Sequence, residues 1–314
     1  MSNEGSSPHH RNMPVIEIEH LHKRYRDHVA VHDVSLSVSE GEIFGIVGPN
    51  GAGKTTTVES VAGLRVPDGG RISVLGLDPR RDRARLHAVL GVQLQAGELP
   101  DKLRVHEAAE LFASFYPHPA DPSALLRQWG LWDKRDTAYR ALSGGQKQRL
   151  SIVLALVGSP RVAILDELTT GLDPQARRDT WDAIEQIRDA GVTVVLVTHF
   201  MEEARRLCDR VAVIDAGRVV ALDTPAHLVA ALPGGQRLRF RPSEPFADAL
   251  LTSLPEVVGL TRHGEQVAVT GRGDLLAAVT SALAAHGVVA IDLRLEQADL
   301  DDAFVALTTR RELA

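Results

Sequence analysis

The feature that most constrains the fold is a glycine-rich segment between an apolar run and a helix-like stretch. Glu42–Val47 is typical of a buried strand, and Lys54–Ala62 has a helical pattern. The residues between and including Gly48 and Thr56 read Gly-Pro-Asn-Gly-Ala-Gly-Lys-Thr-Thr and match G-x-x-x-x-G-K-[ST]. A strand, a glycine-rich loop and a helix in this order predict a phosphate-binding loop in an α/β fold.

Each residue type in this loop has a physical reason. Glycines let backbone N–H groups curl around an anion, and the helix that begins at Lys54 directs its positive dipole end at the phosphates. We expect Lys54 to reach the β- and γ-phosphates and the Thr55 hydroxyl to bind Mg²⁺. The residues expected to contact the nucleotide here are Gly48, Pro49, Asn50, Gly51, Ala52, Gly53, Lys54, Thr55 and Thr56.

Another strand-like run, Val162–Leu165, ends in two adjacent carboxylates, Asp166 and Glu167. Unpaired buried charge is costly, so a buried strand that ends in this way needs a compensating ion. We expect Asp166 to hold Mg²⁺ directly or through water, and Glu167 to act as the general base that polarises the attacking water. An exposed acidic turn is the alternative, which the presence of a phosphate loop disfavours.

The segment Leu142–Gln146, Leu-Ser-Gly-Gly-Gln, is a second candidate anion site. Ser143 can cap a helix, and Gly144 and Gly145 expose N–H groups at its positive end. A single nucleotide needs only one such site. We therefore expect each nucleotide to lie between two copies of the chain, one contributing the phosphate loop and the other Ser143–Gln146, in a two-fold dimer.

These motifs resemble those of the ATP-binding cassette (ABC) family over about Val15 to Leu232. The resemblance implies an α/β P-loop NTPase fold with a RecA-like parallel core, an N-terminal antiparallel β layer and a helical subdomain at about 96–157. It implies ATP and Mg²⁺ as ligands. It also implies roles for four further residues: adenine stacking by Tyr25, Mg²⁺ contact and γ-phosphate sensing by Gln95, contact with the partner's site by Asp173, and γ-phosphate contact by His199.

The expected catalytic residues are thus Glu167, His199, Lys54 and Gln95, and the expected metal ligands are Thr55, Gln95 and Asp166. Gln93 lies on the same strand face and competes with Gln95, although the Ala-Gly-Glu that follows favours Gln95. One residue departs from the family pattern, because Leu168 replaces the usual proline after the catalytic glutamate. Proline fixes φ, so we expect leucine to leave this loop freer.

Strand-like and helical runs alternate through the rest of this region and predict a largely parallel sheet. Pro233-Gly234-Gly235 indicates a boundary. Beyond it, the order strand, helix, strand, strand, helix, strand predicts a small α+β ferredoxin-like domain over 236–314, with Asp274 as a helix N-cap and a last amphipathic helix at Leu300–Thr308. We expect residues 1–14 to be a disordered, polar lead-in.

Composition narrows the function further. The net charge of −6 matches a phosphate backbone poorly, so nucleic acid is not an expected partner. The single cysteine, Cys208, excludes an internal disulfide and fits a reducing cytoplasm; it lies in a polar, helix-like stretch and reads as a structural thiol. No run approaches the roughly 20 apolar residues that span a bilayer.

The segments Gly91–Gln95, Leu99–Leu103 and Leu295–Leu307 look like those of bacterial drug exporters, including the daunorubicin-resistance type. The resemblance implies an ATP-hydrolysing subunit at the cytoplasmic face of the membrane, a separate integral membrane permease and a second copy as partners, and an accessory C-terminal domain. Leu99 and Leu103 are expected to help line the permease groove. The alternatives are a soluble ABC ATPase that acts on ribosomes or DNA, and a non-hydrolysing regulatory subunit.

Overall fold

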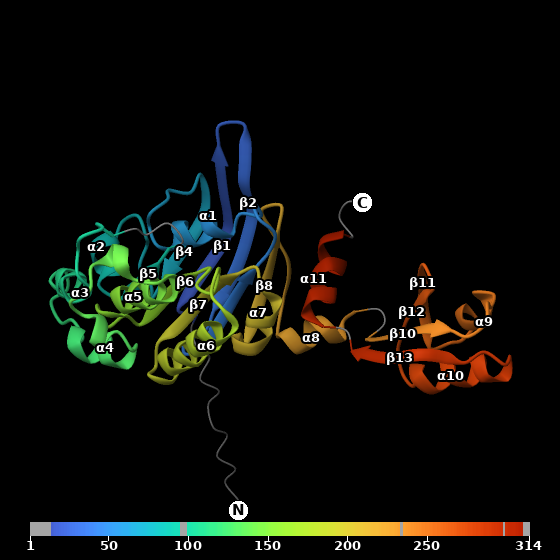
Figure 1. The fold of residues 1–314 in the computed structure, drawn as a ribbon. Helices are drawn as coiled ribbons and strands as arrows, with labels where there is room; N and C mark the ends of the chain where they lie inside the picture. Colours follow the sequence, from blue (N-terminus) through green and yellow to red (C-terminus); the bar gives the residue numbers. More distant parts are fainter. Residues whose placement is uncertain (1–13, 95–98, 233–234, 298, 310–314) are drawn as a thin grey trace, which may run out of the picture. The chain divides into compact units, whose positions relative to one another are not determined.

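The computed structural model describes residues 14–94, 99–232, 235–297 and 299–309 (Figure 1). The expected lead-in, apart from its last residue, and Gln95 lie outside the described residues. The chain divides into two compact units, Met1–Leu222 and Asp223–Ala314. Each unit has its own sheet, as the two separate runs of strand-and-helix patterns predict.

The larger unit is built on a sheet with the strand order β4-β1-β2-β9-β8-β3-β7-β6-β5 (Figure 1). Its antiparallel part consists of β1 (Ile16–Tyr25), β2 (His28–Val38) and β4 (Gly69–Val74). Its parallel part consists of β3 (Ile43–Val47), β5 (Leu90–Gln93), β6 (Val162–Asp166), β7 (Thr193–Thr198) and β8 (Arg210–Asp215). The predicted α/β class is confirmed. The antiparallel strands continue the main sheet through the pair Asp33–Arg218, with β9 (Arg218–Asp223).

Every residue of β3, β6 and β7 is buried. Helices α1 (Lys54–Val61), α6 (Pro174–Asp189) and α7 (Met201–Leu207) pack around the sheet, and this burial explains why these strands read as continuous apolar runs. Because the three strands are parallel neighbours in register, their carboxyl ends meet at one edge. That edge receives the phosphate loop, the acidic pair and His199.

The helical segment contains α3 (Val105–Ala113), α4 (Pro122–Gln128) and α5 (Gly144–Leu156), which pack on one another, and the 3-10 turns Trp132–Lys134 and Tyr139–Ala141. Helix α3 ends at Ala113, and Phe115 in the turn that follows is exposed. The short helix α2 (Arg83–His87) and strand β9 carried no periodic signal strong enough to predict them. Helix α7 ends at Leu207, so Cys208 is the buried residue after it.

The smaller unit contains β10 (Gln236–Pro242), α9 (Ala249–Thr252), β11 (Val257–His263), β12 (Gln266–Gly271), α10 (Leu275–Ala285) and β13 (Ala290–Gln297). The sheet is antiparallel in the order β11-β12-β10-β13, an order in which the two β-α-β halves interleave. The Asp274 side chain accepts a hydrogen bond from the Ala277 N–H, so it caps α10. Helix α8 (Pro225–Ala230) packs against α11 (Leu300–Thr309), and both therefore belong to this unit.

Candidate nucleotide site

The phosphate loop has a conformation that its glycines make possible. Gly51 and Gly53 have φ angles of 81° and 101°, in the region that residues with a side chain rarely occupy. A Cβ on Gly53 would lie 2.4 Å from the Ala30 carbonyl oxygen, and a Cβ on Gly48 would lie 2.1 Å from the Ile214 carbonyl oxygen. At these two glycines the loop therefore lies directly against the backbone of β2 and β8.

Lys54 begins α1 and is buried directly behind this loop. Its Nζ donates hydrogen bonds to the carbonyl oxygens of Gly48 (2.8 Å) and Pro49 (3.1 Å). Burial lowers the pKa of Lys54, and the nearby carboxylates of Glu167 and Asp166 raise it in opposition. The ammonium group is therefore held at the loop by two carbonyl oxygens, and the two nearby carboxylates favour its charged form.

An open pocket of about 700 Å³ surrounds the loop. The predicted residues that line it are Tyr25, Asn50, Gly51, Ala52, Gly53, Lys54, Thr55, Thr56, Glu167 and His199. Sequence reasoning missed His28, Ala30 and Thr170, which also line it. The first two are on β2, where no motif distinguishes them from other strand residues. Tyr25 is exposed at the rim, where an adenine ring could stack on it.

Asp166 is the last residue of β6 and is almost fully buried. Neither of its carboxylate oxygens has a hydrogen-bond partner of good geometry among the described residues. Burial and the adjacent Glu167 raise the pKa of Asp166 to about 6, while Lys54 and the Thr55 hydroxyl lower it. An orphaned carboxylate beside a threonine hydroxyl is an oxygen donor set that suits Mg²⁺.

Glu167 and His199 lie together at the mouth of the pocket. The Nδ1 of His199 is 3.3 Å from Oε1 of Glu167. Glu167 has φ 51°, and its N–H donates to the Val197 carbonyl oxygen, so the chain turns sharply after β6 while remaining bonded to β7. The side chain of Leu168 is fully buried. Leucine therefore anchors this loop by packing, where a proline would do so by fixing φ.

Gln93, the alternative to Gln95, forms two hydrogen bonds with its side-chain amide at the ends of β5 and β6. Its Oε1 accepts a hydrogen bond from the Asp166 N–H (3.0 Å), and its Nε2 donates to the Leu94 carbonyl oxygen (3.1 Å). Gln93 is buried and does not line the nucleotide pocket. It supports the end of β6.

Ser143 and Gln146 form a reciprocal cap at the start of α5. The Gln146 N–H donates to Ser143 Oγ (3.3 Å), and the Ser143 N–H donates to Gln146 Oε1 (3.0 Å). None of the four residues 143–146 lines the pocket around Lys54. Gly144 lines a separate pocket, of about 440 Å³. Asp173 caps α6 by accepting from the Gln175 and Ala176 N–H groups, both at 3.0 Å, and these bonds lower its pKa.

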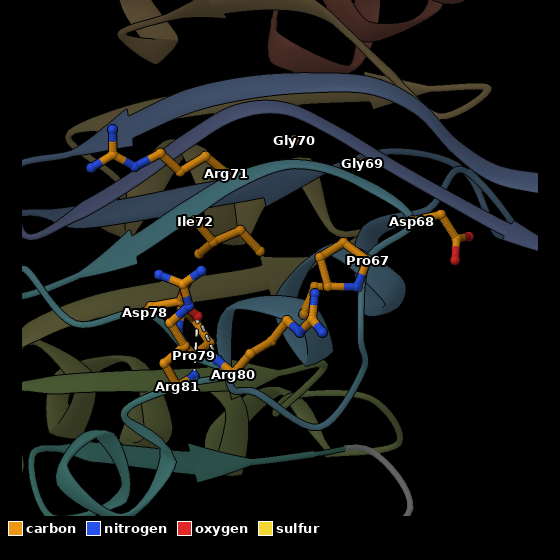
Figure 2. Close-up of a pocket in the computed structure, with 11 residues that line it drawn as sticks. Pro67, Asp68, Gly69, Gly70, Arg71, Ile72, Asp78, Pro79, Arg80 and Arg81 are labelled. Carbon is orange, nitrogen blue, oxygen red and sulfur yellow. Dashed lines mark hydrogen bonds and ion pairs between the residues drawn. The ribbon is translucent and has the colours of Figure 1, made fainter.

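A further hollow, of about 460 Å³, lies beside β4 (Figure 2). Asp78 orders its rim, because Oδ1 accepts from the N–H groups of Arg80 (2.8 Å) and Arg81 (3.2 Å). No residue of the phosphate loop or of the acidic pair lines this hollow. It is therefore separate from the nucleotide pocket.

A phosphate loop at an open pocket, with an unpaired aspartate and an adjacent glutamate–histidine pair, defines a nucleotide hydrolase of the P-loop class. The family model described as "ABC transporter" matches residues 31–170. The chain is 37% identical over 302 residues to the daunorubicin resistance ATP-binding protein DrrA3 of Streptomyces coeruleorubidus, covering 93% of this chain and 95% of that protein. It is 36% identical over 307 residues to the Nod factor export ATP-binding protein I of Ralstonia nicotianae, covering 95% and 94%.

A solved structure of an ATP-binding subunit of an ABC transporter superimposes with a TM-score of 0.63 at 28% identity, over 69% of this chain and 92% of that one. This chain belongs to the ABC transporter family, as an ATP-binding subunit that hydrolyses ATP to drive transport. Within the described residues, no helix has both the length and the apolar character needed to cross a membrane.

Proposed function

We propose that this chain binds two MgATP molecules between two copies of itself and thereby drives a separate membrane permease that exports a small molecule. The observation that carries the dimer is the separation within one chain of two anion-binding segments. Ser143–Gln146 caps a helix outside the pocket around Lys54, so a nucleotide in that pocket leaves this segment of the same chain free for another copy. A two-fold dimer places each such segment on its partner's nucleotide.

The pocket supports a direct route for hydrolysis. Lys54 and the loop N–H groups bind the β- and γ-phosphates, and Thr55 and Asp166 hold Mg²⁺, which neutralises charge on those phosphates. Glu167 takes the proton of the attacking water. With its own proton on Nδ1, His199 donates to Glu167 Oε1 and keeps that carboxylate at the mouth of the pocket. Loss of the γ-phosphate removes contacts that favour the closed dimer, and the copies separate.

Export is proposed because relatives similar over nearly the whole chain are named for daunorubicin resistance and for Nod factor export. A groove of about 630 Å³ supports a docking site for the permease on the larger unit. Leu64 and Phe115, both exposed, line it together with Tyr116. Leu99 instead lines the pocket beside α5, and Leu103 lines neither, so Leu64 and Phe115 replace this pair as the proposed contacts.

The dimer is tested with Glu167→Gln, which should bind MgATP but lose steady-state hydrolysis. We expect this variant to run as a dimer with MgATP on size exclusion with light scattering, and as a monomer with ADP. Adding Ser143→Arg, which places a bulky cation at the N-terminus of α5, should abolish the dimer while ATP binding survives. A double variant that still dimerises, or a Glu167→Gln chain that hydrolyses ATP normally, contradicts the proposal.

A further inference from the structure

Glu203 is a buried carboxylate that the nucleotide pocket does not use. It lies on α7 and has no solvent exposure. The Trp181 indole Nε1, from α6, donates to its Oε1 at 3.1 Å. The Thr198 and Thr169 hydroxyls lie close enough to lower the pKa of Glu203, although burial has the larger effect and raises it.

A fully buried acid is costly, so its retention calls for a reason. The donors around Glu203 come from three segments that each carry a site residue. Thr198 directly precedes His199, Thr169 follows Glu167 and Leu168, and Trp181 is on the helix that Asp173 caps. Glu203 thus lies beside the segments that carry these three site residues, and it is hydrogen-bonded to the one that carries Trp181.

The link to the histidine turn is the most direct. The Phe200 N–H donates to Thr198 Oγ1 at 3.0 Å, and the helix that carries Glu203 begins at the next residue, Met201. The turn that carries His199 therefore runs directly into the helix that the Trp181–Glu203 hydrogen bond joins to α6. Phe200 is also held from the other side, since the Arg177 guanidinium carbon lies 4.7 Å from its ring centroid and the His199 ring lies 4.1 Å from it.

We propose that Glu203 is a positioning residue, which locks the turn carrying His199 onto helix α6 and so fixes the His199–Glu167 contact. The lock also joins the turn carrying His199 to the helix that Asp173 caps, through Trp181. This inference rests on the proposed roles of Glu167, His199 and Asp173. Helices α6 and α7 pack on each other and on β7, so these groups lie in one packed region of the larger unit (Figure 1).

The chemistry requires a carboxylate here. The indole N–H and the two hydroxyls can all donate, and an ionised carboxylate is the side chain that only accepts. Glutamine has the same shape but brings two donor hydrogens into a site lined by donors. Glu203→Gln therefore changes the hydrogen-bond pattern with little change in volume, which separates positioning from packing.

The test compares Glu203→Gln with Glu202→Gln in the full chain. Glu202 is the preceding residue on α7 and is exposed, so its variant removes the same charge outside the network. For Glu203→Gln we expect kcat for ATP hydrolysis to fall about 10- to 100-fold, because a small misplacement of catalytic groups is costly. The KM for ATP should stay within about twofold, since Lys54 and the loop are untouched. Glu202→Gln should match the parent in both.

A purely structural role predicts a different outcome, a lower Tm with unchanged kcat per folded molecule, and that result overturns the proposal. If Glu203→Gln does not fold, Trp181→Phe removes a single donor and keeps an aromatic ring; its kcat should fall with KM unchanged. An unchanged kcat in Trp181→Phe then overturns the proposal. If Glu167→Gln has no effect on hydrolysis, the proposed function itself fails, whereas an active Glu203→Gln beside an inactive Glu167→Gln removes this inference alone.

Discussion

Replacing Asp166 with asparagine should stabilise the protein in the absence of nucleotide and Mg²⁺. The carboxylate is buried, its oxygens have no hydrogen-bond partner of good geometry among the described residues, and its pKa is raised to about 6 from an ordinary 3.8. Each pH unit of displacement is worth about 1.4 kcal/mol, so the charged form costs the folded state about 2–3 kcal/mol at neutral pH. Asparagine has nearly the same shape and carries no charge.

The sign of the pH dependence follows from the same displacement. The folded state binds the Asp166 proton more tightly than the unfolded state does, so the penalty is absent below about pH 4 and complete above about pH 6. The advantage of Asp166→Asn in Tm should thus be about 5–10 °C at pH 7.5 and should shrink as the pH falls toward 4. Differential scanning calorimetry in EDTA measures it.

Bound MgATP should reverse the order of the two Tm values, so that the parent becomes more stable than Asp166→Asn. With saturating MgATP, a chain that binds the complex gains stability in proportion to the logarithm of ligand over Kd, and Asp166→Asn should gain much less than the parent. Asp189→Asn, at an exposed position on α6, is the control and should change neither Tm nor the response to MgATP. A lower Tm for Asp166→Asn in EDTA at every pH would refute the reasoning that this carboxylate is an uncompensated charge.

Two further substitutions test the loop and the groove. Gly48→Ala forces a methyl group against the Ile214 carbonyl, so it should lower the unfolding free energy in urea titrations by about 1–3 kcal/mol and weaken ATP binding. Gly235→Ala, where a Cβ meets nothing within 4 Å, is the control and should change neither quantity. A fully stable Gly48→Ala would contradict the close packing. Phe115→Glu should leave the ATPase activity of the isolated chain intact but abolish co-purification with the co-expressed permease; equal recovery of the permease would exclude the groove.

The sequence predicts the site best where chemistry and backbone geometry agree on one residue type. Lys54, Asp166, Glu167 and His199 follow strand ends that parallel pairing must bring to one edge, so their proximity could be expected without coordinates. Lining residues such as His28 could not be foreseen, because His28 reaches the pocket from the end of the β1–β2 hairpin, where it pairs with Tyr25. The position of Ser143 outside the pocket was expected from the presence of two anion-binding segments.

Leu168 shows a limit of pattern reasoning. A departure from a family residue predicted a freer loop, because the comparison with proline considers only the φ angle. The leucine side chain is fully buried, and packing supplies a restraint that a local backbone argument cannot include. Short helices such as α2 and α8 could not be predicted, for a related reason. A helix of one or two turns is stabilised by tertiary contacts and leaves little periodicity in the sequence.

Asp166 and Glu203 show how two buried carboxylates can be assigned opposite roles. Both have pKa values raised by burial, so burial alone does not distinguish them. Glu203 is bonded to an indole N–H and lies beside two hydroxyls, all within its own chain, which makes it an internal support. Asp166 lies beside Lys54 and Thr55, which line the nucleotide pocket, and neither of its oxygens has a hydrogen-bond partner of good geometry among the described residues, which suits a cation ligand. The groups around a buried carboxylate, and the presence or absence of a pocket next to it, therefore decide whether that carboxylate supports the fold or the chemistry.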